Sequence, residues 1–115
     1  MDIIKDRRNL HQIPELQWDL PKTSEYIKKA LEGLNCRIFS PVDTAVCAFF
    51  DFGNESAITF RADMDALPIT EMTGADYAST HEGVMHACGH DGHMAILLEL
   101  ARRLSKKQSC PTMCC

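Results

Sequence analysis

The sequence predicts a single α/β domain built from layered helices and strands. Three observations predict this class: apolar residues recur at helical spacing near both ends of the chain, short strand-like runs occupy its middle, and no internal repeat or second block of composition occurs. The 115 residues are 45% hydrophobic and 24% charged. This composition is typical of a globular domain that buries a core.

Two helices are expected in the first third of the chain. Residues 1–11 are weakly helical, and this helix should end before Pro14, because a residue that precedes a proline disfavours helical geometry. Residues 21–34 predict a stronger helix, since Pro21 suits a first turn. Its apolar residues at helical spacing are Tyr26, Ile27, Ala30, Leu31 and Leu34. We expect this apolar face to cover a sheet.

Strand candidates occupy residues 37–39, 45–52 and 57–62, and Gly53-Asn54-Glu55 is expected to join the last two as a hairpin turn. The third candidate leads directly into Asp63 and Asp65. Ligands of α/β proteins gather at the carboxyl ends of strands, so these two acids are candidates for a site. Residues 67–84 are rich in Thr, Gly and Pro and predict a loop.

The last predicted helix spans residues 91–108. Its apolar face consists of Met94, Leu97, Leu98, Ala101 and Leu104. An acidic residue lies in the opening turn and basic residues lie in the closing turns, and both placements suit the helix dipole.

Charge and composition exclude several classes of partner. The net charge is −4 and no block of Lys or Arg occurs, so we expect no nucleic-acid partner. No apolar run approaches the roughly 20 residues that a membrane-spanning helix needs, and the first residues do not resemble a signal peptide. We therefore expect a cytoplasmic protein with no membrane partner. The six cysteines show no spacing typical of a disulfide framework.

Residues 86–93, His-Ala-Cys-Gly-His-Asp-Gly-His, carry the strongest chemical signal in the chain. One glycine separates Cys88 from His90, so sulfur and nitrogen can converge on one ion in an extended or turning backbone. Thiolate and imidazole together favour zinc or a neighbouring first-row metal over calcium or magnesium. Two ligands do not complete such a site, so the remaining ligands must come from elsewhere.

The other histidines and acids near this motif allow more than one interpretation. His86 and His93 are further candidate ligands, and His93 could instead hydrogen-bond a carboxylate near the metal. Asp91 could cap the helix or contact the metal. His11 and His81 are expected to be solvent-exposed, because they lie in polar loops or at a helix end.

Asp63 and Asp65 lie at alternate positions and would point the same way if the strand continues. One of them could cap the turn before Pro68. The interpretation that we favour is that one of them, preferably Asp65, holds a histidine ligand or tempers the charge of the metal. Arg61 would pair with one of these acids or with nothing.

Three segments in order resemble the signatures of one family. They are residues 8–16 (Arg-Asn-Leu-His-Gln-Ile-Pro-Glu-Leu), residues 61–69 (Arg-Ala-Asp-Met-Asp-Ala-Leu-Pro-Ile) and residues 83–94 (Gly-Val-Met-His-Ala-Cys-Gly-His-Asp-Gly-His-Met). The chain resembles the aminoacylase-like metalloamidohydrolases and metallopeptidases, which include hippurate hydrolases, N-acyl-amino-acid amidohydrolases, N-acetyl-diaminopimelate deacetylases and auxin-conjugate hydrolases. The resemblance covers roughly residues 5–107.

This resemblance implies the N-terminal part of a three-layer, zinc-exopeptidase-like catalytic domain. The family hydrolyses the amide bond of N-acyl amino acids with metal-activated water at a two-metal site holding Zn, Mn, Ni or Co, and is often homo-oligomeric. Cys88 and His90 match its first two ligands, and Asp65 is a candidate supporting residue. The family's other ligands and its general-base glutamate, in a Gln-Pro-Ala-Glu-Glu motif, match no position in this sequence.

The departures from the family predict a partial domain. Residues 1–108 would form part of the catalytic domain, without the lid and dimerisation domain, and residues 17–21 lie where relatives tend to have a glycine and a glutamate. Residues 109–115 are unlike the family. Read one base earlier, the codons of this tail permit Leu-Pro-Tyr-Asn-Val-Leu, so we hypothesise a frameshift near Gln108. The absence of the general base leads us to expect that the 115-residue chain is inactive.

Two other functions fit parts of the sequence. A small structural zinc module could use Cys88 and His90 with the tail residues Cys110, Cys114 and Cys115, although their spacing is irregular. A cysteine hydrolase could use Cys88 as nucleophile with His90 or His93 as base, although residues so close in sequence rarely give that geometry. Protection of Cys88 from alkylation by metal separates a ligand thiolate from a nucleophile.

Overall fold

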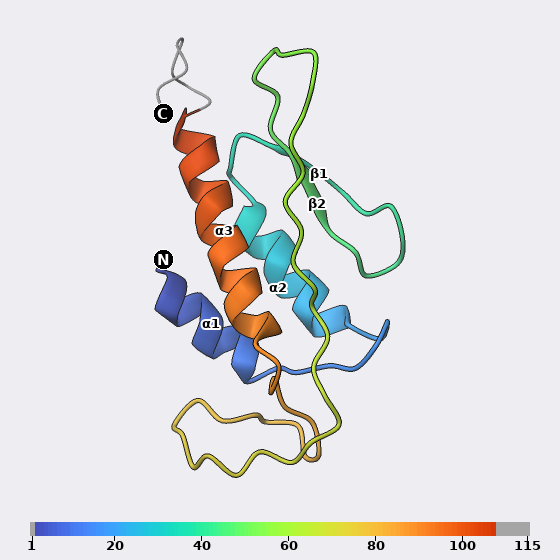
Figure 1. The fold of residues 1–115 in the computed structure, drawn as a ribbon, viewed down its shortest axis with the longest axis vertical. Coiled ribbons are helices and arrows are strands. Elements are labelled where there is room, and N and C mark those ends of the chain that lie inside the picture. Colours follow the sequence, from blue (N-terminus) through green and yellow to red (C-terminus); the bar gives the residue numbers. More distant parts are fainter. Residues whose placement is uncertain (1, 108–115) are drawn as a thin grey trace.

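The computed structural model describes residues 2–107, which form three helices and a small antiparallel sheet. The elements in order are α1 (Ile3–His11), α2 (Pro21–Leu31), β1 (Arg37–Phe39), β2 (Cys47–Phe49) and α3 (His90–Lys107). Helix α3 contacts both α1 and α2, and the sheet lies on the α2 side of the bundle (Figure 1). The predicted α/β class is confirmed. The predicted tail, residues 109–115, lies outside the described residues.

The core lies where the three helices meet. Its buried residues are Leu10, Ile27, Leu31, Met94, Leu98 and Ala101. Five of these six belong to the apolar faces that the sequence predicts for the second and third helices. Ile38 and Ala48 of the sheet pack against this cluster, so the second helix and the sheet share one core, as expected.

Local backbone signals explain where the helices begin and end. The Asp2 carboxylate accepts a hydrogen bond from the Lys5 backbone N–H at 2.8 Å and caps α1, which ends at His11 before Pro14 as predicted. Helix α2 ends at Leu31 rather than at the predicted residue 34. Gly33 has a φ of +82°, a left-handed conformation that ends helices and that glycine adopts without strain.

The prediction of a third strand is wrong. Strand β1 pairs with β2 in antiparallel register, with Arg37 opposite Phe49 and Phe39 opposite Cys47. Residues 57–62 form no strand, and Gly53-Asn54-Glu55 joins no hairpin within residues 2–107. This segment has the composition of a strand, but no described segment lies beside it to accept its hydrogen bonds.

The long loop between residues 67 and 85 is closed at its ends. Leu67 and Met85 form an isolated antiparallel bridge, with N–H to O distances of 2.9 and 3.0 Å. The loop prediction for residues 67–84 is therefore confirmed, and the bridge sets the position of the motif that follows it. None of the helices among residues 2–107 is long and apolar enough to span a membrane.

A buried ion pair joins the first and last helices. The Asp6 carboxylate, which is fully buried, contacts the Arg102 guanidinium and accepts a hydrogen bond from the Tyr26 hydroxyl at 2.8 Å. Burial, together with the Asp6 carboxylate, raises the pKa of Tyr26 above its ordinary value, against a lowering hydrogen bond with Asn9. One carboxylate thus connects α1, α2 and α3.

Candidate metal centre

Cys88 and His90 lie at the junction between the long loop and α3. His90 is the first residue of α3, and Cys88 is exposed two residues before it. Gly89, between them, has a φ of +100°, which a residue with a side chain rarely adopts. The local geometry therefore needs glycine in the Cys-Gly-His motif, because this residue turns the chain from loop into helix.

Asp65 fixes the orientation of the His90 ring. His90 Nδ1 lies 2.9 Å from the Asp65 backbone oxygen and 3.0 Å from its carboxylate Oδ1. Both partners only accept hydrogen bonds, so Nδ1 carries the proton and Nε2 keeps a free lone pair. Metal-binding histidines commonly have this arrangement. The His90 ring therefore fits a metal ligand, and Asp65, the acid that the sequence favoured, is the carboxylate that contacts it.

Asp63 points to a different partner. Its carboxylate pairs with the Arg61 guanidinium at 2.7 Å, and both side chains are substantially exposed. The hydrogen bonds and charge of Arg61 hold the pKa of Asp63 below its ordinary value. Of the two acids, Asp65 and not Asp63 contacts His90 among the described residues.

His11 is buried, so the expectation of solvent exposure is wrong. Only 3% of the residue is exposed, and its ring lies between two carboxylates. Nδ1 is 2.7 Å from Asp91 Oδ2, and Nε2 is 2.9 Å from Glu71 Oε1. Arg7, one helical turn earlier, contacts the same Asp91 oxygen at 2.9 Å. The sequence left open whether Asp91 caps the helix or contacts the metal. In the structure its carboxylate forms ion pairs with α1.

The charges in this cluster support one another. A neutral imidazole has one N–H, so only protonated His11 can donate to two ionised carboxylates. Burial opposes ionisation of Glu71, but hydrogen bonds from the Thr73 hydroxyl, the Ser79 backbone N–H and His11 outweigh it and lower the pKa of Glu71 to about 2. The cluster joins α1, the long loop and the first turn of α3 directly after His90.

His86 lies beside this cluster and is almost fully buried. Its ring centroid is 6.5 Å from that of His11, and only 4% of the residue is exposed. Neither ring nitrogen has a hydrogen-bond partner among the described residues. Burial lowers the pKa of His86, so the ring is held in its neutral form. Whether it acts as a ligand stays a prediction.

The remaining two histidines differ in their surroundings. His93 is exposed one turn after His90, with 6.1 Å between the ring centroids. His81 is half-buried, and its Nδ1 lies 2.7 Å from the Pro14 carbonyl oxygen. The expectation of solvent exposure is therefore wrong for His81 also.

No group of three or more His, Cys, Asp or Glu side chains within residues 2–107 is arranged to hold a metal ion. Cys88 and His90 thus form at most part of a chelate in this portion of the chain. The alternative ligands Cys110, Cys114 and Cys115 lie outside the described residues.

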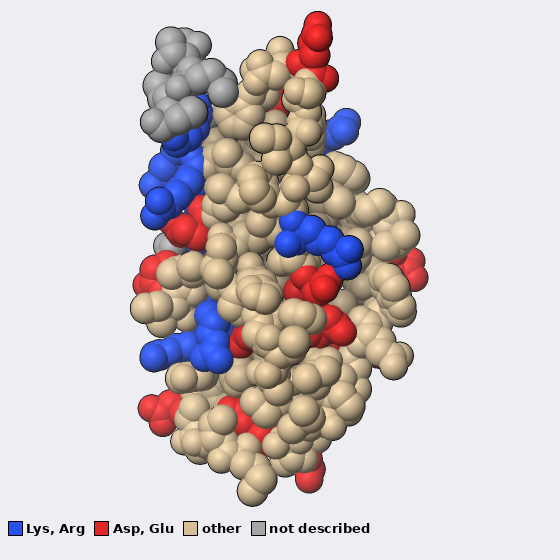
Figure 2. All heavy atoms as spheres, viewed as in Figure 1, with Lys and Arg blue, Asp and Glu red and all other residues tan. Residues whose placement is uncertain are grey.

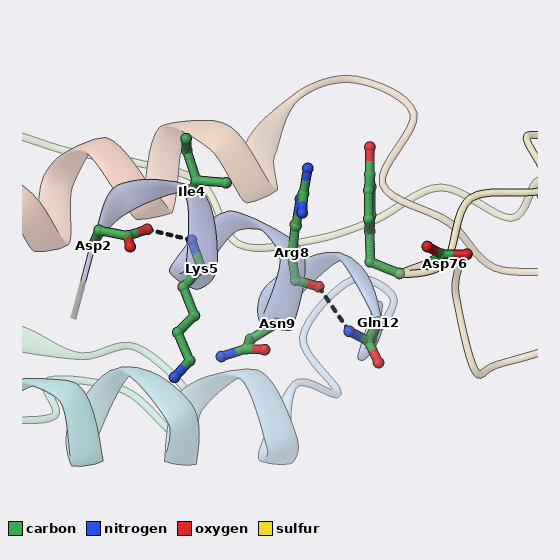
Figure 3. Close-up of a pocket in the computed structure, with 8 residues that line it drawn as sticks. Asp2, Ile4, Lys5, Arg8, Asn9, Gln12 and Asp76 are labelled. Carbon is green, nitrogen blue, oxygen red and sulfur yellow. Dashed lines mark hydrogen bonds between the residues drawn. The ribbon is translucent and has the colours of Figure 1, made fainter.

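A separate pocket of about 430 Å³ lies on the outer face of α1 (Figure 3). Arg8 lines it, with its guanidinium 4.7 Å from the centre of the Tyr77 ring. Asp76 and Lys5 also line this pocket, and none of the predicted metal-site residues does. It is therefore distinct from the Cys88 and His90 site.

The sequence interpretation missed Arg7 and Glu71. Arg7 and His11 are four residues apart and share one face of α1, a spacing that could have suggested a common acidic partner. Glu71 gave no such signal, because its partners lie 60 residues away and within its own irregular loop.

The chain is similar to proteins of known sequence and structure. Residues 59–111 match the family model for peptidase family M20/M25/M40. An uncharacterized hydrolase from Staphylococcus aureus (strain bovine RF122 / ET3-1) is 42% identical over 106 residues, which are 92% of this chain and 28% of that protein. A corresponding hydrolase from Staphylococcus haemolyticus is 44% identical over 101 residues, 88% of this chain and 26% of that protein.

Two solved structures have the same arrangement. A putative aminohydrolase from methicillin-resistant Staphylococcus aureus superposes with a TM-score of 0.87 at 41% identity, over 94% of this chain and 29% of that one. A Bacillus subtilis protein described as a dinuclear metal binding peptidase from the M20 family has a TM-score of 0.85 at 37% identity, over 93% and 31%. This chain therefore spans between a quarter and a third of the length of these relatives.

Proposed function

We propose that this chain belongs to peptidase family M20/M25/M40, whose family model matches residues 59–111, and that Cys88 and His90 supply two ligands of a divalent-metal centre that hydrolyses the amide bond of N-acyl amino acids. The contact between Asp65 and His90 Nδ1 carries this proposal, because it leaves Nε2 free to bind a metal. Similarity to a dinuclear metal binding peptidase supports a two-metal site.

The roles of this chain's residues follow from their geometry. Cys88 is exposed and can present a thiolate, and His90 can present Nε2. Asp65 holds the His90 ring and neutralises part of the positive charge that a metal would bring. Bound divalent metal would supply Lewis acidity toward the amide carbonyl and would activate water. Thiolate and imidazole ligands suit zinc best, and Mn, Ni and Co are the other metals that the resembled family implies.

The catalytic step needs residues that this chain does not provide. The 115 residues contain no Gln-Pro-Ala-Glu-Glu sequence, which in the resembled family carries the general base. A positioned base contributes about 10²–10⁴-fold to such a reaction. We therefore expect the chain alone to bind metal without turning over substrate.

Equilibrium dialysis against Zn²⁺, Mn²⁺ and Co²⁺ tests the proposal in the purified 115-residue chain. We expect Cys88→Ser and His90→Gln each to weaken binding by at least about tenfold, whereas His81→Gln, a half-buried histidine away from the motif, leaves it unchanged. Binding that survives both substitutions but is lost on replacing the three tail cysteines would favour the structural zinc module instead. Turnover of acetyl- or benzoyl-amino acids by the chain would contradict the expected inactivity.

A further inference from the structure

The first turn of α3, which carries His90, is weakly held by its own sequence. It contains Gly92, a weak helix former, and the residue before it is Gly89, which has no side chain to cap the helix. The first buried apolar residue of α3 is Met94, one turn later. Apolar packing therefore begins only beyond the turn that carries His90.

A buried carboxylate holds this turn instead. Among residues 90–93 only Asp91 is buried, at 1% exposure. Its Oδ1 accepts a hydrogen bond from the Gly92 backbone N–H at 2.9 Å. Its Oδ2 contacts two groups of α1, His11 Nδ1 at 2.7 Å and Arg7 Nε at 2.9 Å. Asp91 therefore ties the start of α3 to α1.

The His11 ring is fixed on both sides. Its Nε2 lies 2.9 Å from Glu71 Oε1, so the ring cannot turn away from Asp91 without losing this second contact. Glu71 in turn accepts hydrogen bonds from the Ser79 backbone N–H at 2.8 Å and from the Thr73 hydroxyl. In Figure 1 the end of α1, the yellow loop and the start of α3 meet at one end of the bundle.

The cluster supplies direction as well as attachment. The face drawn in Figure 2 is mostly uncharged, so the cluster does not continue a wider charged surface there. Burying ionised side chains costs desolvation free energy that apolar packing of similar volume would avoid. Apolar packing holds a surface, whereas hydrogen bonds between charged groups also fix the direction of individual atoms.

We propose that His11 is a positioning residue of the metal centre. Through Asp91 it holds the first turn of α3 in the orientation in which His90 Nε2 and the Cys88 sulfur bind the same ion. This role rests on the proposed function, in which Cys88 and His90 are the ligands. His11 itself touches neither the metal nor a substrate.

Two carboxylates then support His90 in different ways. Asp65 orients its ring, and Asp91 holds the helical turn that carries it. Supporting partners of this kind change metal affinity by about 10–100-fold. Charge alone predicts the opposite direction, because removing a positive charge from His11 or Arg7 lessens the repulsion of a divalent cation and should tighten binding. A loss of affinity therefore identifies positioning.

Titration of the reduced 115-residue chain with Co²⁺ compares two substitutions of His11. The amide nitrogen of Asn lies at about the position of histidine Nδ1, and that of Gln lies at about the position of Nε2. His11→Asn therefore keeps a donor toward Asp91, whereas His11→Gln keeps one toward Glu71, and both remove the same charge. We expect His11→Gln to weaken cobalt binding about tenfold and His11→Asn to stay within about threefold of wild type.

Arg7 and Arg8 give a matched pair that leaves the buried ring in place. Both guanidinium groups lie over the Tyr77 ring, 5.3 and 4.7 Å from its centre, but within residues 2–107 only Arg7 contacts Asp91. Arg7→Gln should weaken cobalt binding about threefold, because one of several contacts is lost, and Arg8→Gln should leave it unchanged. This pair tests the role even where a His11 variant fails to fold.

Hydrogen exchange without metal separates positioning from a general loss of stability. The His93 N–H, which donates to the Gly89 carbonyl at 3.1 Å, should exchange at least about tenfold faster in His11→Gln than in His11→Asn. The Leu98 amide, in the middle of α3, should exchange at the same rate in the two variants.

Several results would overturn the positioning role alone. They are equal cobalt affinities for wild type, His11→Gln and Arg7→Gln, tighter binding on loss of either cation, equal weakening by His11→Asn and His11→Gln, and equal weakening by Arg7→Gln and Arg8→Gln. Each of these leaves Cys88 and His90 as ligands. Absence of cobalt binding by the wild-type chain would instead overturn the proposed function and the positioning role together.

Discussion

Replacing Glu71 by Gln tests the buried charge cluster that holds the long loop and α1 against the first turn of α3. The Glu71 side chain is 4% exposed and contacts His11, which in turn contacts Asp91, the residue that follows His90. Gln keeps the shape and one acceptor oxygen but removes the charge. We expect Glu71→Gln to destabilise the folded chain at neutral pH and to change how its stability depends on pH.

The magnitude follows from the pKa of Glu71. Its value is about 2 in the folded chain against an ordinary 4.5, and each unit is worth about 1.4 kcal/mol, so ionised Glu71 contributes roughly 3 kcal/mol. Because the folded pKa is lowered, this contribution is present above pH 4.5 and is lost as pH falls toward 2. At pH 3 only about 1 kcal/mol remains, so about 2 kcal/mol disappears between pH 6 and pH 3.

Urea unfolding of wild type and Glu71→Gln, followed by circular dichroism at pH 6, 4 and 3, measures this effect. The difference in the free energy of unfolding between the two proteins should shrink by about 2 kcal/mol from pH 6 to pH 3. Glu82→Gln, an exposed position on the same loop, serves as the matched control and should show a constant difference. A constant difference for Glu71→Gln would refute the proposed charge cluster.

Two further predictions concern packing and backbone. Leu98→Ala should cost about 2–4 kcal/mol in urea unfolding, because Leu98 is buried in the core between the helices, whereas Ile96→Ala on the exposed side of α3 should cost about 1 kcal/mol or less. An equal cost at both positions would contradict the assigned face of α3. Gln17→Gly should stabilise the chain by about 1 kcal/mol, because Gln17 has a φ of +52° that glycine adopts without strain, and a lower thermal midpoint would contradict this reasoning.

The helices could be predicted because their signals are local. The apolar spacing of Met94, Leu98 and Ala101 gives α3 its buried face, and the motif before it places His90 at the helix start. The strand-like composition of residues 57–62 did not predict their structure, because a strand also needs a neighbour to accept its hydrogen bonds. The same residues therefore form an exposed extended segment.

The candidate site was predictable in part for the same reason. Cys88 and His90 are two residues apart, and the alternate spacing of Asp63 and Asp65 limited the supporting carboxylate to two candidates. The surroundings of His11 could not be predicted, because its partners Glu71 and Asp91 are 60 and 80 residues away. The place of His11 at a helix end suggested solvent exposure, but its tertiary contacts bury it.

Cobalt spectroscopy of the 115-residue chain tests most directly whether Cys88 and His90 bind a metal together. Titration of the reduced chain with Co²⁺ should produce a sulfur-to-cobalt charge-transfer band that Cys88→Ser abolishes and that Asp65→Ala weakens by reducing affinity about 10–100-fold. Replacement of Cys36, a partly buried cysteine that contributes to neither the motif nor the tail, should leave the band intact. If no such band forms, or if it persists in Cys88→Ser, the two residues are not metal ligands in this protein.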